Sequence, residues 1–540
     1  MNAQRTPQSA AQLLSTGQVI VAAALVLLAI SEAAVLGPLA LLKTAVALAI
    51  VFYVVFVGFK IALWSASGSR DVPLYRLPDA GEPDLPWYTI LVPLRGEAEV
   101  VAKLVEALCR LRYPARKLEI LLLLEDYDLD TQAAVKEISL PDHFHVLIVP
   151  DVGPRTKPKA CNFGYMHATG ERVVIFDAED RPEPDQLLRA VAAFRAITAR
   201  HPDVGCLQAE LAFWNPRGGW VSSFYWAEYV VHFQRVLSGL ARLRLIPPLG
   251  GTSNHFSIKA LDAVSKDNGN WEFPDAHGKT MIMRGPWDPY NVTEDADLAF
   301  RLALSGYRIG MFASVTYEEA PDTARKAKNQ RSRWLQGYAQ TGLVHTRHPL
   351  QSMRRVGPLR YLAFTLFMLG TPVSLLLNPL MWATTIFYIV SRVERLTAAS
   401  TFINGLFPTP VYFAGMMVAV AGNAALFYQK LVTPIARQQR SERASEGSTQ
   451  HPLGGYLSRQ EYGLCSRLLL TPLWWAFTSL SAYRAARKLL IPSQRSQWDK
   501  TPHGHALREE AEVEMAPIRR RDAQQSARPI QQESWSTRAT

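Results

Sequence analysis

Cysteine is scarce in this chain, and several familiar motifs are missing. The four cysteines have neither the spacing of metal ligands nor that of a disulfide framework, which fits a reducing compartment. No Gly-x-Gly-x-x-Gly or phosphate-loop pattern occurs, which argues against a dinucleotide cofactor and against ATP hydrolysis. The N-terminus also lacks the short apolar core and cleavage site of a secretory signal. We therefore expect the apolar stretches near it to be retained as membrane anchors.

Long apolar runs are present on both sides of a more polar block. The chain of 540 residues is 48% hydrophobic. Runs at 19–36 and 43–64 each approach the roughly 20 apolar residues that cross a bilayer. Further runs lie at 361–390, 410–432 and 464–486. The first of these contains Pro372 and Pro379, so it predicts either one long kinked helix or two short helices.

The sequence predicts four regions. They are an N-terminal membrane region at 1–69 with two transmembrane helices, a soluble domain at 70–350, a C-terminal membrane region at 351–490 with three or four transmembrane segments, and a polar, disordered tail at 491–540. The net charge of +11 is compatible with nucleic acid, anionic lipid or an anionic substrate. Arg and Lys cluster beside apolar runs at 354–360 and 484–488, which favours a membrane surface on the cytoplasmic side. We expect a multi-pass protein of the inner (plasma) membrane, with a cytosolic domain and no nucleic-acid partner.

Apolar runs of strand length alternate with helical patterns in the soluble domain. Runs rich in Val, Ile and Leu predict buried strands at 88–94, 118–124, 145–149 and 172–176. Helical patterns follow at about 97–111, 157–169 and 184–200. This alternation predicts an α/β domain with a mostly parallel, doubly wound sheet, whose ligands bind at the carboxyl ends of the strands.

Acidic residues follow two of the predicted strands. They are Glu125, Asp126 and Asp128 after the second strand, and Asp177, Glu179 and Asp180 after the fourth. Hard cations such as Mg²⁺ or Mn²⁺ prefer carboxylate oxygens, and such a cation neutralises the diphosphate of a nucleotide-sugar. Each cluster alone is also compatible with a solvated acidic turn. Two clusters at the sheet edge, with a third after residue 290, favour a site over a turn.

A basic stretch, Pro154 to Asn162, opens the helix that follows the third strand. Its cations and backbone N–H groups are suited to contact phosphate or a nucleoside. An exposed basic first turn is the structural alternative.

Three consecutive residues, Thr293, Glu294 and Asp295, start a helix that ends near Gly306. Acids in a first turn stabilise the helix dipole, so a structural role is the default. A glycosyl transfer, however, requires a rigidly held carboxylate that takes a proton from the acceptor hydroxyl. We expect this motif to be catalytic, with Asp295 as the base.

Gln330, Arg333 and Trp334 share one face of a later helix, because residues three and four apart lie side by side. The planar guanidinium of Arg333 can meet a departing diphosphate, and Trp334 offers a flat face for a sugar ring. A Trp close to a membrane run could instead be an interfacial anchor.

In their order and spacing, these motifs resemble those of the processive family-2 glycosyltransferases, the cellulose, curdlan, chitin and hyaluronan synthases. The signature of that family is Asp, Asp-x-Asp, Thr-Glu-Asp and Gln-x-x-Arg-Trp. The matching residues are Asp126, Asp177-Ala178-Glu179-Asp180, Thr293-Glu294-Asp295 and Gln330 to Trp334. The resemblance, which covers 88–345, implies a GT-A-like domain inserted in a helical transmembrane bundle. It also implies an inverting transfer from a nucleoside diphosphate sugar, expected to be a UDP-sugar, to a growing glycan that enters a membrane channel.

The resemblance also implies residue roles. Asp126 would bind the nucleoside and Asp177 the nucleotide-sugar, while Lys159 and Asn162 match a nucleotide-contacting Lys-Ala-Gly-Asn-like motif. Gly251 and Thr252 match a loop of small residues that lines the acceptor site. An ordinary turn is the alternative for that loop.

The chain departs from the family pattern at the expected metal site. Where relatives usually have Asp-Ala-Asp, this chain has Asp177-Ala178-Glu179-Asp180. The metal would therefore be bound by Asp177 together with Glu179 or Asp180. Two other functions stay open: a transferase that adds a single sugar to a lipid or glycan, and a non-catalytic membrane receptor on a transferase fold.

Overall fold

The computed structural model describes residues 8–67, 75–215, 219–274, 280–393, 470–491 and 494–495. All of these belong to one compact unit, Met1–Thr501. The predicted apolar run at 410–432 and most of the predicted tail lie outside the described residues.

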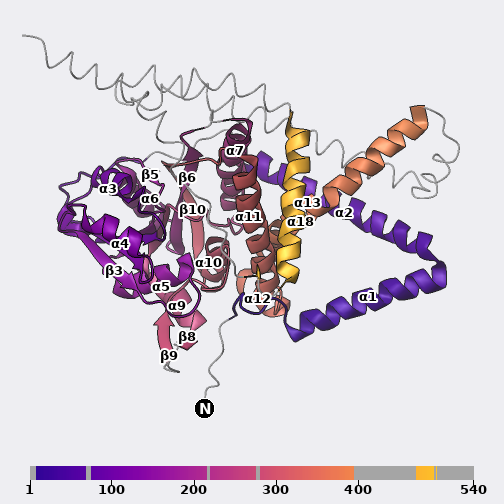
Figure 1. Cartoon of the computed structure of the whole chain (residues 1–540), viewed down its shortest axis with the longest axis horizontal. Helices are drawn as coiled ribbons and strands as arrows, with labels where there is room; N and C mark the ends of the chain where they lie inside the picture. The colour runs from indigo at the N-terminus through magenta and orange to yellow at the C-terminus, as the bar shows by residue number, and fades with distance from the viewer. Residues whose placement is uncertain are drawn as a thin grey trace, which may run out of the picture. The chain divides into compact units, whose positions relative to one another are not determined.

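A mixed sheet forms the centre of the soluble domain (Figure 1). Its strands are β1 (Tyr88–Leu94), β2 (Leu118–Glu125), β3 (Phe144–Val149), β4 (Arg172–Ile175), β5 (Arg181–Pro182), β6 (Val204–Phe213), β7 (Asn254–Ser257) and β10 (Arg308–Glu318). Their order is β3-β2-β1-β4-β7-β6-β10-β5. β7 is antiparallel to both of its neighbours and β5 is antiparallel to β10, whereas the other pairings are parallel. The expected parallel majority is confirmed, and the two reversed strands make the sheet mixed.

The centre of the sheet is covered on both faces, because β1, β2 and β4 are largely apolar and buried. Successive residues of a strand point to opposite faces. Accordingly, Leu91 and Leu121 pack in one core with α5 (Lys157–His167) and α10 (Glu294–Leu304). Ile90 and Ile120 pack in another core with α3 (Val101–Cys109) and α6 (Gln186–Thr198). The helices around the sheet are α3 (Val101–Cys109), η1 (Ala115–Lys117), α4 (Leu129–Lys136), α5 (Lys157–His167), α6 (Gln186–Thr198), α7 (Trp220–Val231), η2 (His232–Leu237), α8 (Ser238–Arg242), α9 (Ile258–Asn268) and α10 (Glu294–Leu304). A hairpin of β8 (Asn270–Pro274) and β9 (Thr280–Arg284) forms a second, two-stranded sheet.

Three helices in the described part of the chain are long and apolar enough to cross a membrane. They are α1 (Thr16–Leu36), α2 (Pro38–Ser67) and the Pro358–Ala383 part of α13 (Pro358–Val393). α13 is one continuous helix that contains Pro372 and Pro379, so the single-helix alternative for 361–390 holds.

Two further helices connect the sheet domain to these apolar helices. α11 (Ala324–His345) contacts α10, α13 and α18 (Thr471–Leu490), and α12 (Pro349–Val356) leads into α13. α18 falls in the run predicted at 464–486, carries Arg484, Arg487 and Lys488, and is not among the membrane-length apolar helices. α11 and α18 lie between the sheet and the apolar helices in Figure 1.

Candidate active site

The carboxyl ends of β1, β2 and β4 lie at one edge of the sheet, because these strands are parallel neighbours. Asp126 follows β2 and Asp177 follows β4. β7 pairs with β4 in the opposite direction, so the loop that precedes β7, with Gly251 and Thr252, reaches the same edge. Topology therefore brings together residues that are more than a hundred positions apart in the sequence.

Lys157 lies at the centre of this edge. Its Nζ is 2.5 Å from Asp177 Oδ1 and donates a hydrogen bond to the Gly251 carbonyl at 2.9 Å. Burial alone would lower the pKa of this ammonium group, but the nearby carboxylates of Asp177 and Glu294 raise it above its usual value. Lys157 is therefore a fixed positive charge among acids. It belongs to the predicted basic stretch, but the sequence pattern did not single it out.

Asp295 and Glu294 begin α10 and face the same cation. Burial raises the pKa of Asp295 to about 6, although Lys157 and the backbone N–H groups of Ala296 and Gly251 pull it down. Asp295 Oδ1 accepts a hydrogen bond from the Ala296 amide at 2.8 Å. Burial, opposed by Lys157 and reinforced by Asp295, raises the pKa of Glu294 to about 8. The first turn of α10 thus holds two carboxyl groups that bind protons more strongly than exposed acids do.

Gly251 lies directly beside Asp295. A Cβ atom at this position would lie 3.5 Å from Asp295 Oδ2, and the φ of 74° is one that glycine adopts readily. The loop predicted to line the acceptor site therefore lies in contact with the carboxylate of the predicted base.

Thr293, the residue directly before α10, packs against α11. A Cβ at Gly337 of α11 would lie 2.4 Å from the Thr293 methyl group, so only glycine lets the two helices approach this closely. The Thr293 hydroxyl lies 3.3 Å from that of Thr341, one turn further along α11. The Thr-Glu-Asp motif and the helix with the Gln-x-x-Arg-Trp motif are therefore packed directly against each other.

The three predicted residues of α11 have different surroundings. Burial raises the pKa of Asp177, and Lys157 and, more weakly, Arg333 oppose that rise, so Arg333 lies within electrostatic range of Asp177. Trp334 packs against Tyr225 and Tyr229, with ring centroids 5.9 and 6.0 Å apart. Gln330 is buried, and its Oε1 has no hydrogen-bond partner within the described ranges.

A group of carboxylates surrounds Asp177. Burial, together with the charges of Asp177 and Glu179, raises the pKa of Asp180 well above its usual range. Asp180 Oδ2 accepts from the Asp177 amide at 2.7 Å and contacts the Thr252 hydroxyl. Glu318, at the end of β10, has its pKa raised well above its usual range by burial and by Asp180, Glu179 and Asp177. The sequence pattern did not identify Glu318, because the strand that carries it was not predicted.

The oxygen-rich chemistry of this group fits a hard divalent cation. Asp180 Oδ1 is buried and has no hydrogen-bond partner in the described part of the chain. However, the described residues contain no set of three or more acidic, His or Cys side chains arranged to hold a metal, and Asp177 is engaged by Lys157. A cation at Asp177 would therefore have to displace or share the contact with Lys157.

Lys159 and Asn162 are buried and hydrogen-bonded within the protein. Lys159 is fully buried, and its Nζ donates to Glu125 Oε2 at 3.1 Å and to the Pro150 carbonyl at 3.0 Å. Asn162 exchanges two hydrogen bonds with the Trp287 backbone, at 2.8 and 3.1 Å. Both residues thus tie α5 to neighbouring segments.

The predicted nucleoside contact, Asp126, is exposed at the end of β2. Next to it, the Tyr127 ring lies under Arg155, whose guanidinium carbon is 4.0 Å from the ring centroid, and Arg95 lies 5.8 Å from the same centroid. The sequence pattern did not single out this aromatic and cationic surface.

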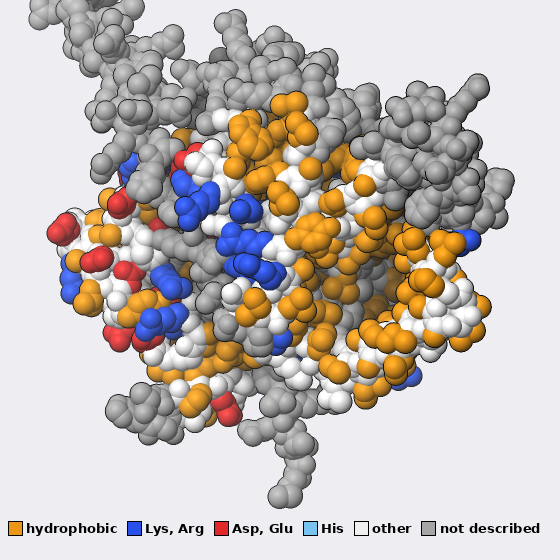
Figure 2. Space-filling model, turned by 45° about the vertical axis from the view of Figure 1, so that its right-hand side comes forward, with side chains coloured by type: hydrophobic (Ala, Val, Ile, Leu, Met, Phe, Trp, Pro, Cys, Tyr) orange, Lys and Arg blue, Asp and Glu red, His pale blue; other side chains and the backbone are white. Residues whose placement is uncertain are grey.

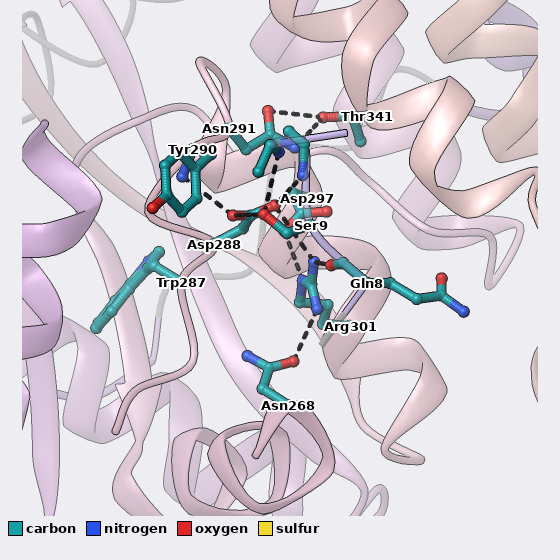
Figure 3. Close-up of polar contacts among 12 residues, drawn as sticks. Gln8, Ser9, Asn268, Trp287, Asp288, Tyr290, Asn291, Asp297, Arg301 and Thr341 are labelled. Carbon is teal, nitrogen blue, oxygen red and sulfur yellow. Dashed lines mark hydrogen bonds and ion pairs between the residues drawn. The ribbon is translucent and has the colours of Figure 1, made fainter. Parts of the chain in front are cut away.

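A buried polar network holds α10 in place through Asp297 and Arg301 (Figure 3). Asp288 accepts hydrogen bonds from Ser9 Oγ at 2.8 Å and from the Ala10 amide at 2.6 Å. Arg301 of α10 donates to Asp297 at 2.5 Å and to the Gln8 carbonyl at 2.6 Å. The segment that precedes α1 is thus bonded directly to the helix that carries Asp295.

Comparison with known proteins identifies two overlapping family matches. Residues 89–240 match the model described as Glycosyl transferase family 2, and 172–428 match the one described as Glycosyl transferase family group 2. A beta-monoglucosyldiacylglycerol synthase of Trichormus variabilis is 28% identical over 260 residues, covering 47% of this chain and 49% of that protein. A probable glucomannan 4-beta-mannosyltransferase 3 of Oryza sativa is 25% identical over 270 residues, covering 48% and 44%. The chain therefore spans about half the length of these curated relatives.

A mannosyltransferase structure from Pyrobaculum calidifontis, in complex with GDP-Man and Mn²⁺, shares 18% identity and a TM-score of 0.48, over 83% of this chain and 99% of that chain. Together the two family matches extend over 89–428, across the sheet, α10, α11 and α13. This chain therefore contains a family-2 glycosyltransferase domain.

Proposed function

We propose that this enzyme is embedded in the inner membrane and transfers sugar, with inversion, from a nucleoside diphosphate sugar to a growing glycan, which it exports as it polymerises. The observation that carries the proposal is the close packing of α11 against Thr293. This packing brings the helix that carries Arg333 and Trp334 against the start of the helix that carries Asp295. In this proposal 70–350 form the cytosolic transferase domain, and 1–69 and 351–490 form the membrane regions.

Asp295 is the proposed base. It takes the proton of the acceptor hydroxyl as the acceptor oxygen bonds to the anomeric carbon, while the bond from that carbon to the diphosphate breaks. A carboxylate with a pKa of about 6 is ionised at neutral pH, yet is a stronger base than an ordinary aspartate. The adjacent first-turn acid, Glu294, also faces Lys157, and burial raises its pKa to about 8, so it holds a proton at neutral pH.

The leaving diphosphate is stabilised by Lys157 and Arg333 in this proposal. Lys157 contacts Asp177 directly and Arg333 acts on it electrostatically, so the proposal places the diphosphate beside Asp177, near both cations. A divalent cation, Mg²⁺ or Mn²⁺, would be held by Asp177 with Glu179 or Asp180 and would neutralise the diphosphate. Asp126 is the proposed nucleoside contact, because it is exposed beside Tyr127.

The acceptor lies between Trp334 and the Gly251–Thr252 loop in this proposal. Trp334 offers part of its ring to a sugar, and Gly251 leaves room beside the Asp295 carboxylate.

A second candidate function is the addition of a single sugar to a membrane lipid. The similarity to beta-monoglucosyldiacylglycerol synthases favours it, as the similarity to a probable glucomannan mannosyltransferase favours a glycan acceptor.

Product analysis separates the two candidates. The purified full chain in lipid vesicles would be supplied in turn with radiolabelled UDP- and GDP-sugars. Label in long chains that resist lipid extraction would support polymerisation. Label confined to an extractable lipid that carries one sugar would support the second candidate, and no transfer from any donor would contradict both.

A further inference from the structure

Residues 8–10, which lie shortly before α1, are bound in a buried site of the transferase domain, and we call them the N-terminal strap. Asp288 accepts hydrogen bonds from the Ser9 hydroxyl and the Ala10 amide, and also from the Tyr290 amide at 3.0 Å (Figure 3). Asp288 is fully buried, and burial raises its pKa to about 6, so it is ionised at neutral pH. A buried charge is tolerated only when its oxygens are hydrogen-bonded, and the strap supplies two of the bonds that this carboxylate requires.

Two arginines of the domain bind the backbone of the strap. Arg301, in α10, donates to the Gln8 carbonyl at 2.6 Å, and Arg347, shortly after α11, donates to the Ser9 carbonyl at 3.0 Å. Together with the two bonds to Asp288, each of these contacts involves a charged group. Such hydrogen bonds are about twice as strong as those between neutral groups, so the strap is held firmly.

The partners of the strap lie on both sides of the Thr-Glu-Asp motif. Asp288 belongs to the loop that leads to Thr293, and Arg301 lies near the far end of the helix that the motif begins. Asn291 of the same loop accepts from the Thr293 amide at 3.1 Å and donates to the Thr341 hydroxyl of α11 at 3.0 Å. The strap therefore binds the chain before and after the motif that carries the proposed base.

Beyond the strap the chain continues into a candidate membrane span. α1 is long and apolar enough to cross a bilayer, and its residues Leu25 and Leu28 are 65% and 70% exposed. Hydrophobic side chains cover a broad area of the face drawn in Figure 2. In the first turn of α1, the Gln18 side chain donates to the Leu343 carbonyl of α11 at 2.8 Å. The strap thus joins the motif to a helix whose exposed apolar surface suits lipid.

We propose that the N-terminal strap is a positioning element for sugar transfer, which holds the loop and the helix around the Thr-Glu-Asp motif through Asp288 and Arg301 and fixes this motif relative to α1. The inference rests on the proposed role of Asp295 as the base. Release of the strap leaves the Asp288 charge buried with two fewer hydrogen bonds, so the loop rearranges to solvate it and the start of α10 moves. A catalytic group that moves by about 1 Å loses much of its effect.

Amide hydrogen exchange and sugar transfer, both measured on the full chain in detergent, test this inference. The double variant Ser9→Ala with Ala10→Pro removes both donors to Asp288 and leaves the domain unchanged, since proline has no backbone N–H. We expect faster exchange in residues 288–298. We also expect kcat for transfer to fall about 10- to 100-fold, the cost of a small displacement of a catalytic group.

The pH dependence of transfer separates positioning from a general loss of folded enzyme. Loss of folded enzyme would lower transfer by the same factor at every pH. A displaced and better solvated Asp295 would instead lose the effect of burial, which raises its pKa to about 6. Its pKa would fall towards the ordinary value of about 3.9, so the decline of transfer in acid would move to lower pH.

Asp288→Asn changes the domain side of the same contact. It leaves one acceptor oxygen in place of two, so it should produce smaller changes in the same direction. The matched controls Gln12→Ala and Glu272→Gln alter exposed side chains and should leave exchange and transfer unchanged.

Three results with the double variant would overturn the inference: transfer at the wild-type rate, a loss of transfer without a shift of its pH dependence, or unchanged exchange in residues 288–298. If the wild type transfers no sugar from any UDP- or GDP-sugar, the proposed function fails, and hydrogen exchange alone decides about the strap. Faster exchange in the double variant would then support its hold on the motif, and unchanged exchange would refute it.

Discussion

The Nζ of Lys157 lies 2.5 Å from Oδ1 of Asp177, so the carboxylate expected to bind metal is paired with a cation of the protein itself. The same ammonium group donates to Gly251 and faces Glu294. Lys157 therefore neutralises Asp177 before any donor arrives, and a donor diphosphate or a metal must rearrange this pair.

Replacing Lys157 by Met should weaken the binding of a nucleoside diphosphate about 10- to 100-fold, because a hydrogen bond to a charged group contributes on the order of 1.5–3 kcal/mol. Calorimetric titration of the purified variant would measure this. Lys157→Arg should recover part of the affinity, and Lys103→Met, at an exposed position of α3, should leave it unchanged. Wild-type affinity in Lys157→Met would show that the cation only balances Asp177.

Gly337→Ala should separate α10 from α11, because the added Cβ would meet the Thr293 methyl group at 2.4 Å. We expect a loss of stability of about 1–3 kcal/mol, the usual cost of overpacking, together with a lower rate of sugar transfer. Gly58→Ala in α2 is the matched control, since nothing lies within 4 Å of its added Cβ. If the two variants have the same melting temperature and the same rate of sugar transfer, the contact between the two motifs is needed neither for stability nor for activity.

Removal of divalent cations by EDTA should stop transfer, and Mg²⁺ or Mn²⁺ should restore it. Asp177→Ala should abolish this restoration, whereas Glu99→Ala, at an exposed position, should not affect it. Electron paramagnetic resonance can measure Mn²⁺ binding. Comparing the variants Glu179→Gln, Asp180→Asn and Glu318→Gln in this way would locate the remaining metal ligand. Full transfer in chelator would refute a metal at this edge.

Trp334→Ala should reduce chain extension more than hydrolysis of the donor by water, because Asp295 and the carboxylates would stay in place. Loss of one aromatic stacking partner costs on the order of 1 kcal/mol. The ratio of incorporated sugar to released nucleotide measures the effect, and Trp334→Phe should preserve it. If both rates fell together, the ring would serve mainly to pack against Tyr225 and Tyr229.

The fold was predictable where the residues of a single strand or helix show the pattern of that element by themselves. β1 and β2 are continuous runs of buried apolar residues and were located to within a residue of their ends. β7 has only four residues and enters the sheet between β4 and β6, against their direction. Such a strand is stabilised by neighbours that are distant in the sequence, so local patterns do not identify it.

The candidate site was predictable as a set of motifs but not as a set of contacts. Lys157 and Lys159 are two residues apart, which places them about 200° apart around a helix. One therefore reaches Asp177 after β4, while the other is fully buried and pairs with Glu125 at the end of β2. Sequence alone does not tell which of the two faces the edge, since that depends on how α5 packs on the sheet.

The most direct test of the account is sugar transfer by the wild type and by Asp295→Asn, measured from pH 5 to 8 with nucleotide binding followed in parallel. Burial raises the pKa of Asp295 to about 6, so the ionised base is lost as the pH falls through that value. Wild-type transfer should therefore decline below about pH 6. Asp295→Asn should transfer about 10²–10⁴-fold more slowly at pH 7 while it binds nucleotide normally. Transfer by Asp295→Asn at the wild-type rate, with the same decline below pH 6, would contradict the assignment of Asp295 as the base.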